Sequence, residues 1–302
     1  MNKNELKKFV EENPKLVSMK SAGENMFVLK YRKSVFYDNL WNDFLEECRG
    51  TIVDKDFNVV SRPFTKIYNY GIEAKAPVLA DDVQVTAYRK VNGFMVAVTV
   101  HNGELLVSTT GSTQNDYVEY AKEMMATHSP LTDWTMTLGN IECSDLTFMF
   151  ECVHPSDPHI IPEKPGMYLL GYREKSWHSL VGHNPFILKE FAQNLKCFGV
   201  ESTTTNMARL KQMAKECKHE GFVFYTEDGR SAKIKSPYYL TSKWVARNPR
   251  TDKLVNMQAD IKKQLDEEYY PLVDAIRANI EEYTSMDEQA RLAWVRNFVE
   301  AV

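Results

Sequence analysis

Residues 83–107 decide the fold class of this protein, and they read Val83-Gln-Val-Thr-Ala-Tyr-Arg-Lys90-Val-Asn-Gly93-Phe-Met-Val-Ala-Val-Thr-Val-His-Asn-Gly-Glu104-Leu-Leu-Val107. Two runs, 83–87 and 94–100, are rich in β-branched and apolar residues, which predicts two strands. An Asn-Gly turn signal lies between them, and a second one in 101–104 predicts a hairpin. The stretch therefore predicts antiparallel β-structure, with Lys90 at the end of a strand.

The same kind of analysis extends to the rest of the chain. Further strands are expected at 50–54, 58–61, 147–153, 166–172, 221–225 and 231–236, the last two as a hairpin. Helices are expected within 2–20 with Asn4 as the cap, at 115–127, 184–198, 207–217, 259–268 and 271–283, and from a capping box at 285–288 to about 299. The pattern predicts an α+β fold: an antiparallel-sheet core flanked by helices in residues 1–240, followed by a small all-α domain in 241–302.

Composition argues against a disordered, a collagen-like or a disulfide-scaffold protein. The 302 residues are 43% hydrophobic and 26% charged, which is typical of a folded globular chain. The longest apolar runs are far shorter than the ~18 residues of a membrane span, and the amino terminus has no signal-peptide core, so we expect no membrane association. Five cysteines without a CxxC pair indicate reduced thiols and a cytoplasmic protein.

Net charge does not by itself indicate a nucleic-acid partner. The formal charge is -4 and the isoelectric point is about 6.0, so any polyanion site must be a local concentration of cations. Residues 230–263 form such a concentration, whereas the tail after Gln264 is mostly acidic. This basic stretch is a candidate for contacts with phosphate.

Four elements along the chain carry residues suited to chemistry. Lys90 is followed by Gly93 in a KxxG pattern, which on its own is common by chance and fits a surface hairpin lysine. Glu151 and Glu220 each lie in or beside an apolar strand, where a carboxylate needs a cation, a metal or good donors unless it faces water at a sheet edge. Strand alternation places Lys233 and Lys235 on one face, either as a solvated basic edge or with an anion between them.

Three more segments add to this ordered set: Cys48-Arg49-Gly50-Thr-Ile-Val53, Ser61-Arg-Pro-Phe-Thr-Lys66-Ile-Tyr-Asn69 and Ser108-Thr-Thr-Gly111-Ser112. As an ordered set over roughly residues 48–240, the motifs resemble those of the covalent nucleotidyltransferase superfamily of ATP-dependent ligases and capping enzymes. Within that superfamily the chain resembles the phage RNA ligase 1 family, the tRNA-repair RNA ligases of T-even phages.

The sequence departs from the family pattern at two positions. The aspartate often found before the motif glycine is Asn92 here, and the lysine expected before Gly111-Ser112 is Thr110. The first is a mild change, because residues between the lysine and the glycine vary across the superfamily. The second leaves one phosphate contact in doubt.

The resemblance implies a three-step reaction. Lys90 attacks the α-phosphorus of ATP, AMP passes from the lysine to an RNA 5′-phosphate, and the RNA 3′-hydroxyl then expels AMP. A free lysine has a pKa of about 10.4, so neighbouring cations must lower it. Lys233, Lys235, Arg49 and bound magnesium (or manganese) are the candidates for this, and Lys233 and Lys235 also count as catalytic by stabilising charge on the phosphate.

The resemblance also assigns the remaining site residues. The ATP-binding set comprises Arg49, Lys66, Gly93, Glu151, Lys233 and Lys235. Glu220 is expected to be a metal ligand, and Glu151 a metal or ribose contact. The residues alone do not separate those roles.

The last 67 residues narrow the choice of substrate. DNA ligases and capping enzymes need an OB-fold module after the KxK strand, whereas this tail is predicted to be helical. The helical tail therefore favours an RNA ligase. The resemblance implies that this ligase mends tRNA with a broken anticodon loop, with an end-healing polynucleotide kinase as a candidate partner, in the host cytoplasm if phage-encoded. We expect no membrane partner. The alternatives are a ligase that seals nicks in duplex RNA and a catalytically inactive RNA-binding relative.

Overall fold

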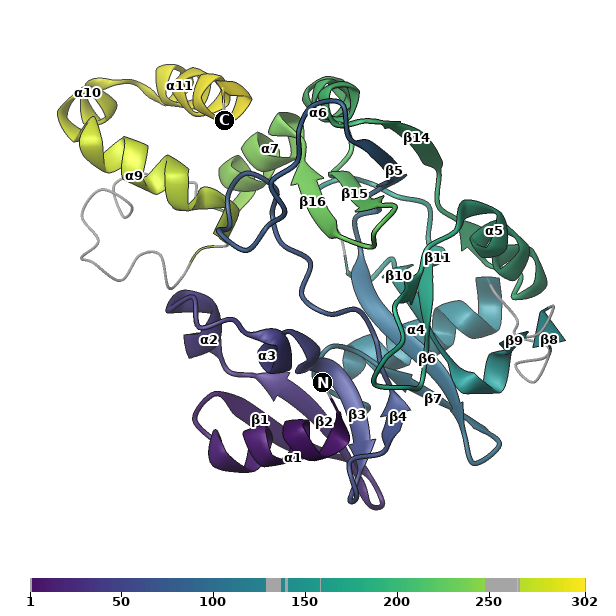
Figure 1. The fold of residues 1–302 in the computed structure, drawn as a ribbon. Coiled ribbons are helices and arrows are strands. Elements are labelled where there is room, and N and C mark those ends of the chain that lie inside the picture. Colours follow the sequence, from purple (N-terminus) through teal and green to yellow (C-terminus); the bar gives the residue numbers. More distant parts are fainter. Residues whose placement is uncertain are drawn as a thin grey trace. The chain divides into compact units, whose positions relative to one another are not determined.

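The computed structural model describes residues 2–128, 137–138, 141–157, 159–247, 265 and 267–301 (Figure 1). The chain forms two compact units. Unit 1 comprises Met1–Lys66, Gly93–His159 and Glu163–Val200, and unit 2 comprises Ile67–Asn92, Ile160–Pro162 and Glu201–Val302. The expected domain boundary near residue 240 stays a prediction.

Unit 1 begins with a four-stranded antiparallel sheet of order β1-β2-β3-β4 and three helices. Its elements are α1 (Lys3–Glu12), β1 (Val17–Gly23), β2 (Met26–Tyr31), α2 (Lys33–Tyr37), α3 (Asp43–Glu47), β3 (Arg49–Asp54) and β4 (Val59–Ser61). The cap of α1 is Asn2 rather than the expected Asn4, because Asn2 and Glu5 form a complete capping box.

A second sheet in unit 1 has the order β12-β11-β10-β6-β7, and β13 pairs in parallel with β11. Its strands are β6 (Phe94–His101), β7 (Glu104–Ser108), β10 (Leu146–Val153), β11 (Gly166–Glu174), β12 (Val181–Gly182) and β13 (Phe198–Gly199). A small hairpin of β8 (Thr137–Leu138) and β9 (Ile141–Glu142) and the turn η1 (Cys143–Asp145) precede β10. The predicted hairpin at 101–104 is confirmed, and Asn102 and Gly103 supply its two positive φ angles.

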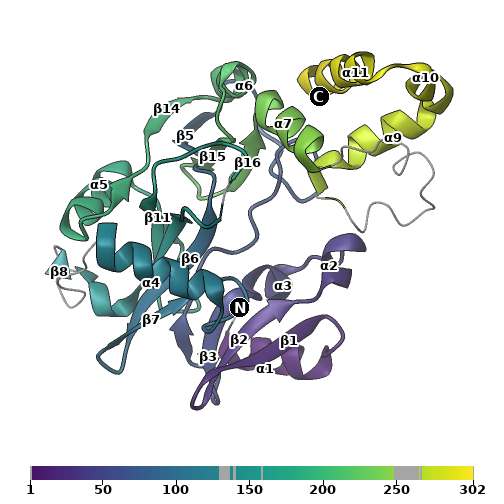
Figure 2. The same cartoon turned by 180° about the vertical axis from the view of Figure 1, so that it is seen from behind.

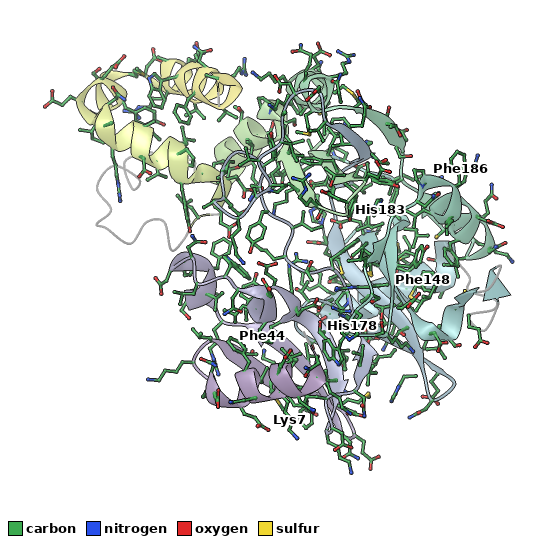
Figure 3. All side chains as sticks on the ribbon, viewed as in Figure 1. Lys7, Phe44, Phe148, His178, His183 and Phe186 are labelled. Atoms are coloured by element: carbon green, nitrogen blue, oxygen red, sulfur yellow. The ribbon has the colours of Figure 1, made fainter. Side chains whose placement is uncertain are left out.

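Two helices cover one face of this second sheet: α4 (Asp116–His128), which Figure 2 shows in front of β6 and β7, and α5 (Pro185–Asn194). On α4 Tyr117 packs against Phe94, and on α5 Phe191 packs against Phe148, which is labelled in Figure 3. Strand alternation then places Glu151 on the opposite face. Helix α5 is shorter than the predicted 184–198, because the chain turns out of the helix and Lys196 adopts a φ of 51°.

Unit 2 is built on an antiparallel sheet of order β14-β5-β15-β16. Its strands are β5 (Gln84–Arg89), β14 (Ser202–Asn206), β15 (Gly221–Thr226) and β16 (Ser231–Lys235), and helix α6 (Met207–Glu216) follows β14. The predicted β15–β16 hairpin is confirmed. One sheet face packs on α6 through a cluster that includes Phe222, Phe224 and Ala232, so the lysines of β16 belong to the other face.

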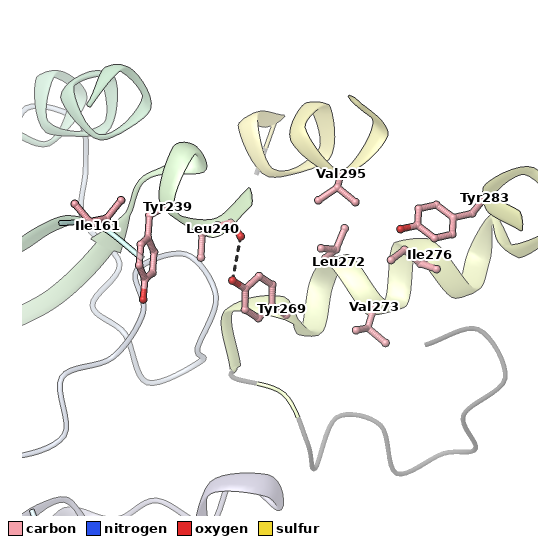
Figure 4. Packing of buried hydrophobic residues seen from close by; sticks show 9 residues of the cluster. All are labelled: Ile161, Tyr239, Leu240, Tyr269, Leu272, Val273, Ile276, Tyr283 and Val295. Atoms are coloured by element: carbon pink, nitrogen blue, oxygen red, sulfur yellow. Dashed lines mark hydrogen bonds between the residues drawn. The ribbon is translucent and has the colours of Figure 1, made fainter. Parts of the chain in front are cut away.

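The chain ends in helices, as predicted, with Tyr269, Leu272, Ile276 and Tyr283 among the residues of their buried core (Figure 4). The elements are α7 (Pro237–Arg247), η3 (Glu267–Tyr269), α9 (Tyr270–Ala278), α10 (Ile280–Ser285) and α11 (Glu288–Ala301). Helix α11 packs against α7 and α9.

Three details of these helices differ from the prediction. The expected helix 271–283 is interrupted at Asn279, whose ψ of 34° leaves the helical range. The cap of α11 is Asp287, which accepts a hydrogen bond from the amide of Ala290, rather than the predicted Ser285. Most of the expected helix 259–268 lies outside the described residues, and its last two residues belong to η3.

Helix and antiparallel sheet together confirm the predicted α+β class. Within the described residues, none of the helices is both long enough and apolar enough to cross a lipid bilayer.

Candidate functional site

Lys90 follows β5 directly and is held there by its backbone and its side chain. Its amide donates a hydrogen bond to the carbonyl of Gly221 at 2.8 Å, which continues the pairing of β5 with β15. Its Nζ lies 3.1 Å from Oε2 of Glu220, and the Lys90 side chain is only 21% exposed. Lys90 is therefore a fixed, half-buried amine rather than a solvated hairpin lysine.

Asn92 holds the carboxylate that faces Lys90. Its Nδ2 donates to Oε2 of Glu220 at 2.8 Å, while its Oδ1 accepts from the amide of Ile161 at 3.1 Å. An ionised aspartate at this position could not donate to Glu220 and would bring two carboxylates together. The departure of Asn92 from the family pattern thus suits the contact that the residue makes.

The ionisation of Glu220 follows from its neighbours. Burial by itself would raise the pKa of this carboxyl, but Lys90, Lys235 and the Asn92 amide outweigh burial and lower the pKa. Glu220 is therefore an anion at neutral pH and a weak base.

The glycine after Glu220 is required by close packing. Gly221 has a φ of +131°, and a Cβ there would lie 2.1 Å from the carbonyl oxygen of Ile234. No other residue fits without displacing β16. This explains why the acid is followed by glycine at this position.

Glu268, from the turn η3, provides an anion for the lysines of the β16 face. Its carboxylate forms a short ion pair with Lys235 and lies 3.1 Å from Nζ of Lys243, while Lys235 is also 3.8 Å from Glu220. We call Lys90, Lys235, Lys243, Glu220 and Glu268 the lysine cluster. The sequence left two interpretations of the KxK pattern, a solvated basic edge or lysines with an anion between them. Lys235 is largely buried beside the Glu268 carboxylate, so it is not part of a solvated edge.

The ionisation of Lys235 and Glu268 is set mainly by the opposite charges around them. Burial would lower the pKa of Lys235, but Glu268 and Glu220 raise it despite the opposing charge of Lys243. Burial would likewise raise the pKa of Glu268, and Lys235 and Lys243 lower it well below its usual range. Both side chains are therefore charged at neutral pH.

Lys233, two residues before Lys235, also belongs to this strand and is half-buried.

Unit 1 contains the other residues of the candidate site. Glu151 on β10 accepts a hydrogen bond from the amide of Gly93 at 3.1 Å and is buried. A Cβ at Gly93 would lie 2.3 Å from the carbonyl oxygen of Cys152. The motif glycine is therefore fixed by the close approach of β6 and β10.

Lys66 lies in an aromatic environment. Its buried side chain places Nζ 4.7 Å from the ring centroid of Trp41 and 5.4 Å from that of Phe36. Cation–π contacts of this kind stabilise an ammonium group.

Arg173 on β11 belongs to a buried ion network. Its guanidinium and that of Arg62 both donate to the carboxylate of Glu47, at 3.0 Å and 2.6 Å. Burial and the charge of Arg62 lower the pKa of Arg173, although Glu47 opposes them. This network ties α3, β11 and the segment after β4 together, which is a structural role.

Arg49, the first residue of β3, pairs with Lys30 of β2 in the register of the first sheet. Both side chains are half-buried. This arrangement brings two cations to neighbouring positions.

The described residues contain no group of three or more His, Cys, Asp or Glu side chains arranged to hold a metal ion. The two sequence-predicted metal ligands belong to different units, Glu220 to unit 2 and Glu151 to unit 1.

Sequence reasoning missed Glu268 and Glu47, and it included Lys243 only as part of the basic stretch 230–263. Glu268 lies in an acidic tail with no motif around it, so only the tertiary contact with Lys235 reveals it. Glu47 directly precedes the quoted segment 48–53, but a single acid gives no signal of its two arginine partners.

Comparison with known proteins gives one family match and several similar proteins. The sequence model of a family described as RNA ligase matches residues 47–239. A protein of Autographa californica nuclear polyhedrosis virus, provisionally named a bifunctional polynucleotide kinase/RNA ligase, is 26% identical over 222 residues. The match covers 64% of this chain and 30% of the viral protein, so this chain spans less than a third of that relative's length.

Solved structures show the same fold. A provisionally named ATP-dependent DNA ligase from Aquifex aeolicus has a TM-score of 0.57 at 17% identity, covering 98% of this chain and 77% of its own. An archaeal ATP-dependent RNA ligase has a TM-score of 0.56 at 16% identity, covering 97% of this chain and 74% of its own. The predicted α+β ligase fold with small C-terminal helices is confirmed.

Proposed function

Because this chain belongs to the RNA ligase family, we propose that it joins an RNA 3′-hydroxyl to a 5′-phosphate in an ATP-dependent reaction through a covalent lysyl-AMP. The observation that supports this most is the placement of Lys90, a half-buried amine fixed between a strand end and the Glu220 carboxylate. Such an amine is suited to nucleophilic attack because its direction is set before substrate binds.

In the first step the neutral Nζ of Lys90 attacks the α-phosphorus of ATP. The new P–N bond replaces the bond between the α-phosphorus and the bridging oxygen, and pyrophosphate leaves. Glu220 orients the amine but is too weak a base to keep its proton, which passes to solvent. Because a carboxylate favours the ammonium form of its neighbour, the ion pair must open when ATP binds.

The later steps restore the lysine. An oxygen of the RNA 5′-phosphate attacks the adenylate phosphorus and breaks the P–N bond, and the RNA 3′-hydroxyl then attacks the activated 5′-phosphorus and expels AMP. Lys233, Lys235 and Arg49 stabilise negative charge on the phosphates during these transfers. Removing one such preorganised donor typically costs about 10²–10³ in rate.

A magnesium or manganese ion would be held by Glu220 and Glu151 together with ATP phosphates, and would neutralise phosphate charge. Gly93 and Lys66 belong to the nucleotide site in this proposal. The partly buried hydrogen bond between Gly93 and Glu151 supports this assignment, because it fixes the strand acid next to the motif glycine.

The test is transfer of radiolabel from α-labelled ATP to the protein with magnesium, followed by denaturing electrophoresis. We expect label on the wild type and none on Lys90→Ala. Lys122→Ala, which removes an exposed lysine, is the control and should label normally. An unlabelled wild type would support the alternative of an RNA-binding relative without catalysis.

The physiological substrate is proposed to be tRNA with a broken anticodon loop, with residues 241–302 as the domain that recognises it. The name of the viral relative includes a polynucleotide kinase, which supports an end-healing kinase as a partner. We also propose a cytoplasmic location. Part of the basic stretch 230–263 lies outside the described residues. Sealing of a broken anticodon stem-loop, compared with a nicked RNA duplex, separates this proposal from the duplex alternative.

A further inference from the structure

Lys30, a residue outside every sequence motif, lies against the segment in which the family lysine is absent. A Cβ at Gly111 would be 2.7 Å from Nζ of Lys30 and 2.9 Å from its Cδ. The absence of a side chain at Gly111 therefore leaves the room in which the Lys30 amine lies. Thr110, the neighbour of Gly111, occupies the position where the family pattern has a lysine.

The segment Arg49–Gly50 also lies beside Thr110. Lys30 and Arg49 are cross-strand partners on β2 and β3. A Cβ at Gly50 would lie 2.9 Å from Cα of Thr110. Two glycines thus allow the segments 49–50 and 110–111 to approach closely, with both cations beside them.

Among the residues that the structure describes, these two cations have no acidic partner. Neither the Lys30 amine nor the Arg49 guanidinium forms a hydrogen bond or ion pair with any residue of the described ranges, although both side chains are half-buried. Burial, followed by the charges of Lys20, Arg49 and Lys33, lowers the pKa of Lys30. Partly buried like charges without a counterion are unfavourable, and a bound anion would relieve them.

We propose that Lys30, together with Arg49, forms a phosphate-binding site in which Lys30 replaces the lysine absent at position 110. The ligand is a phosphate group, supplied either by the triphosphate of ATP or by the 5′-phosphate of RNA. A lysine is suited to this as a compact point charge, and the arginine as a fork of donors. The assignment of these phosphates rests on the proposed ligase function.

The test compares Lys30→Met, Lys30→Arg and the double variant Lys30→Met/Thr110→Lys. Lys55→Met is the matched control, because Lys55 is exposed in the β3–β4 turn and its loss removes the same charge from the same sheet. Three quantities are measured: affinity for inorganic tripolyphosphate by calorimetry, the KM for ATP in self-labelling, and the rate of AMP transfer from labelled protein to 5′-phosphorylated RNA.

We expect Lys30→Met to weaken tripolyphosphate binding about tenfold, which corresponds to about 1.4 kcal/mol. Lys30→Arg should retain most of the affinity, and Thr110→Lys should restore it in the double variant. A rise in KM for ATP alone identifies the triphosphate as the ligand, and slower AMP transfer alone identifies the RNA 5′-phosphate.

Unchanged tripolyphosphate affinity in Lys30→Met, or an equal loss in Lys55→Met, would overturn the proposal. The proposed function is tested separately. If the wild type takes no label from ATP, the ligase proposal fails, whereas tripolyphosphate binding still shows whether Lys30 binds phosphate.

Discussion

At the scale of single residues, the candidate site depends on how each charge is partnered. Lys90 faces Glu220, whereas the sequence analysis expected cations as the neighbours that matter most. Glu220 is itself held by the Asn92 amide. The amide nitrogen of Asn92 stabilises the Glu220 carboxylate beside Lys90, whereas a carboxylate oxygen at the same position would repel it.

The substitution Asn92→Asp tests the hydrogen bond between Asn92 and Glu220, because it replaces the donating amide nitrogen with an oxygen. We expect the variant to be less stable by about 1–3 kcal/mol at neutral pH, because Glu220 loses a donor and faces a second carboxylate. One of the two carboxyls should then have a raised pKa, so the deficit should shrink as pH falls and that group binds its proton. Chemical denaturation at pH 7 and at pH 5 measures both effects. Equal stability of the two proteins at pH 7 would mean that the Asn92–Glu220 contact contributes nothing.

At the scale of elements, two glycines set the distance between strands. The amide of Gly93, directly before β6, donates a hydrogen bond to Glu151 of β10, and Gly221 at the start of β15 leaves room for β16. Strands β10 and β16, which carry Glu151 and Lys235, are thus each positioned by the absence of a side chain on the neighbouring segment.

Gly93→Ala should therefore disturb the β6–β10 pair. Its Cβ would meet the Cys152 carbonyl oxygen at 2.3 Å, so we expect a loss of about 1–3 kcal/mol in stability and slower self-labelling, because Glu151 is displaced. Gly199→Ala is the control, since its Cβ would meet only Ala192, at 3.8 Å. Thermal unfolding compares the two variants, and a Gly93→Ala melting temperature equal to that of the control would contradict the expected clash.

At the scale of the whole molecule, distant parts of the sequence contribute to one charge cluster. Glu268 of η3 reaches Lys235 of β16 and Lys243 of α7, and the apolar core around Leu272 and Tyr283 holds the helices that follow η3. The C-terminal helical segment of unit 2 thereby supplies an anion to the strand that carries the KxK motif.

The lysine cluster also predicts how stability depends on pH. Glu220 and Glu268 have lowered pKa values in the folded protein, so their contribution is complete above the unfolded value of about 4.3 and is lost as pH falls below it. Glu268→Gln should cost about 3 kcal/mol at pH 7 and make the acid limb shallower. Glu12→Gln, which breaks an exposed pair with Lys8, should change stability by less than about 0.5 kcal/mol. Urea unfolding between pH 7 and pH 3 gives both curves, and an unchanged acid limb in Glu268→Gln would contradict the expected coupling.

The sequence by itself determined the strands that carry the motifs, the two confirmed hairpins and the order of the motifs, because alternation, turn residues and motif spacing are local properties of the chain. Strands β2 and β14 lie in stretches for which no strand is predicted. It also located Lys90, Glu220 and Lys235 on elements that the structure confirms as strands or strand ends. Helix boundaries were less certain, since caps such as Asn2 and Asp287 compete with polar neighbours only one or two residues away.

Only the tertiary structure decided which charges meet. Glu268 pairs with a lysine 33 residues earlier, and Lys30 lies against a loop that is 81 residues later in the chain. Such pairs leave no periodic signal, because long-range contacts are set by how sheets and helices pack rather than by residue spacing.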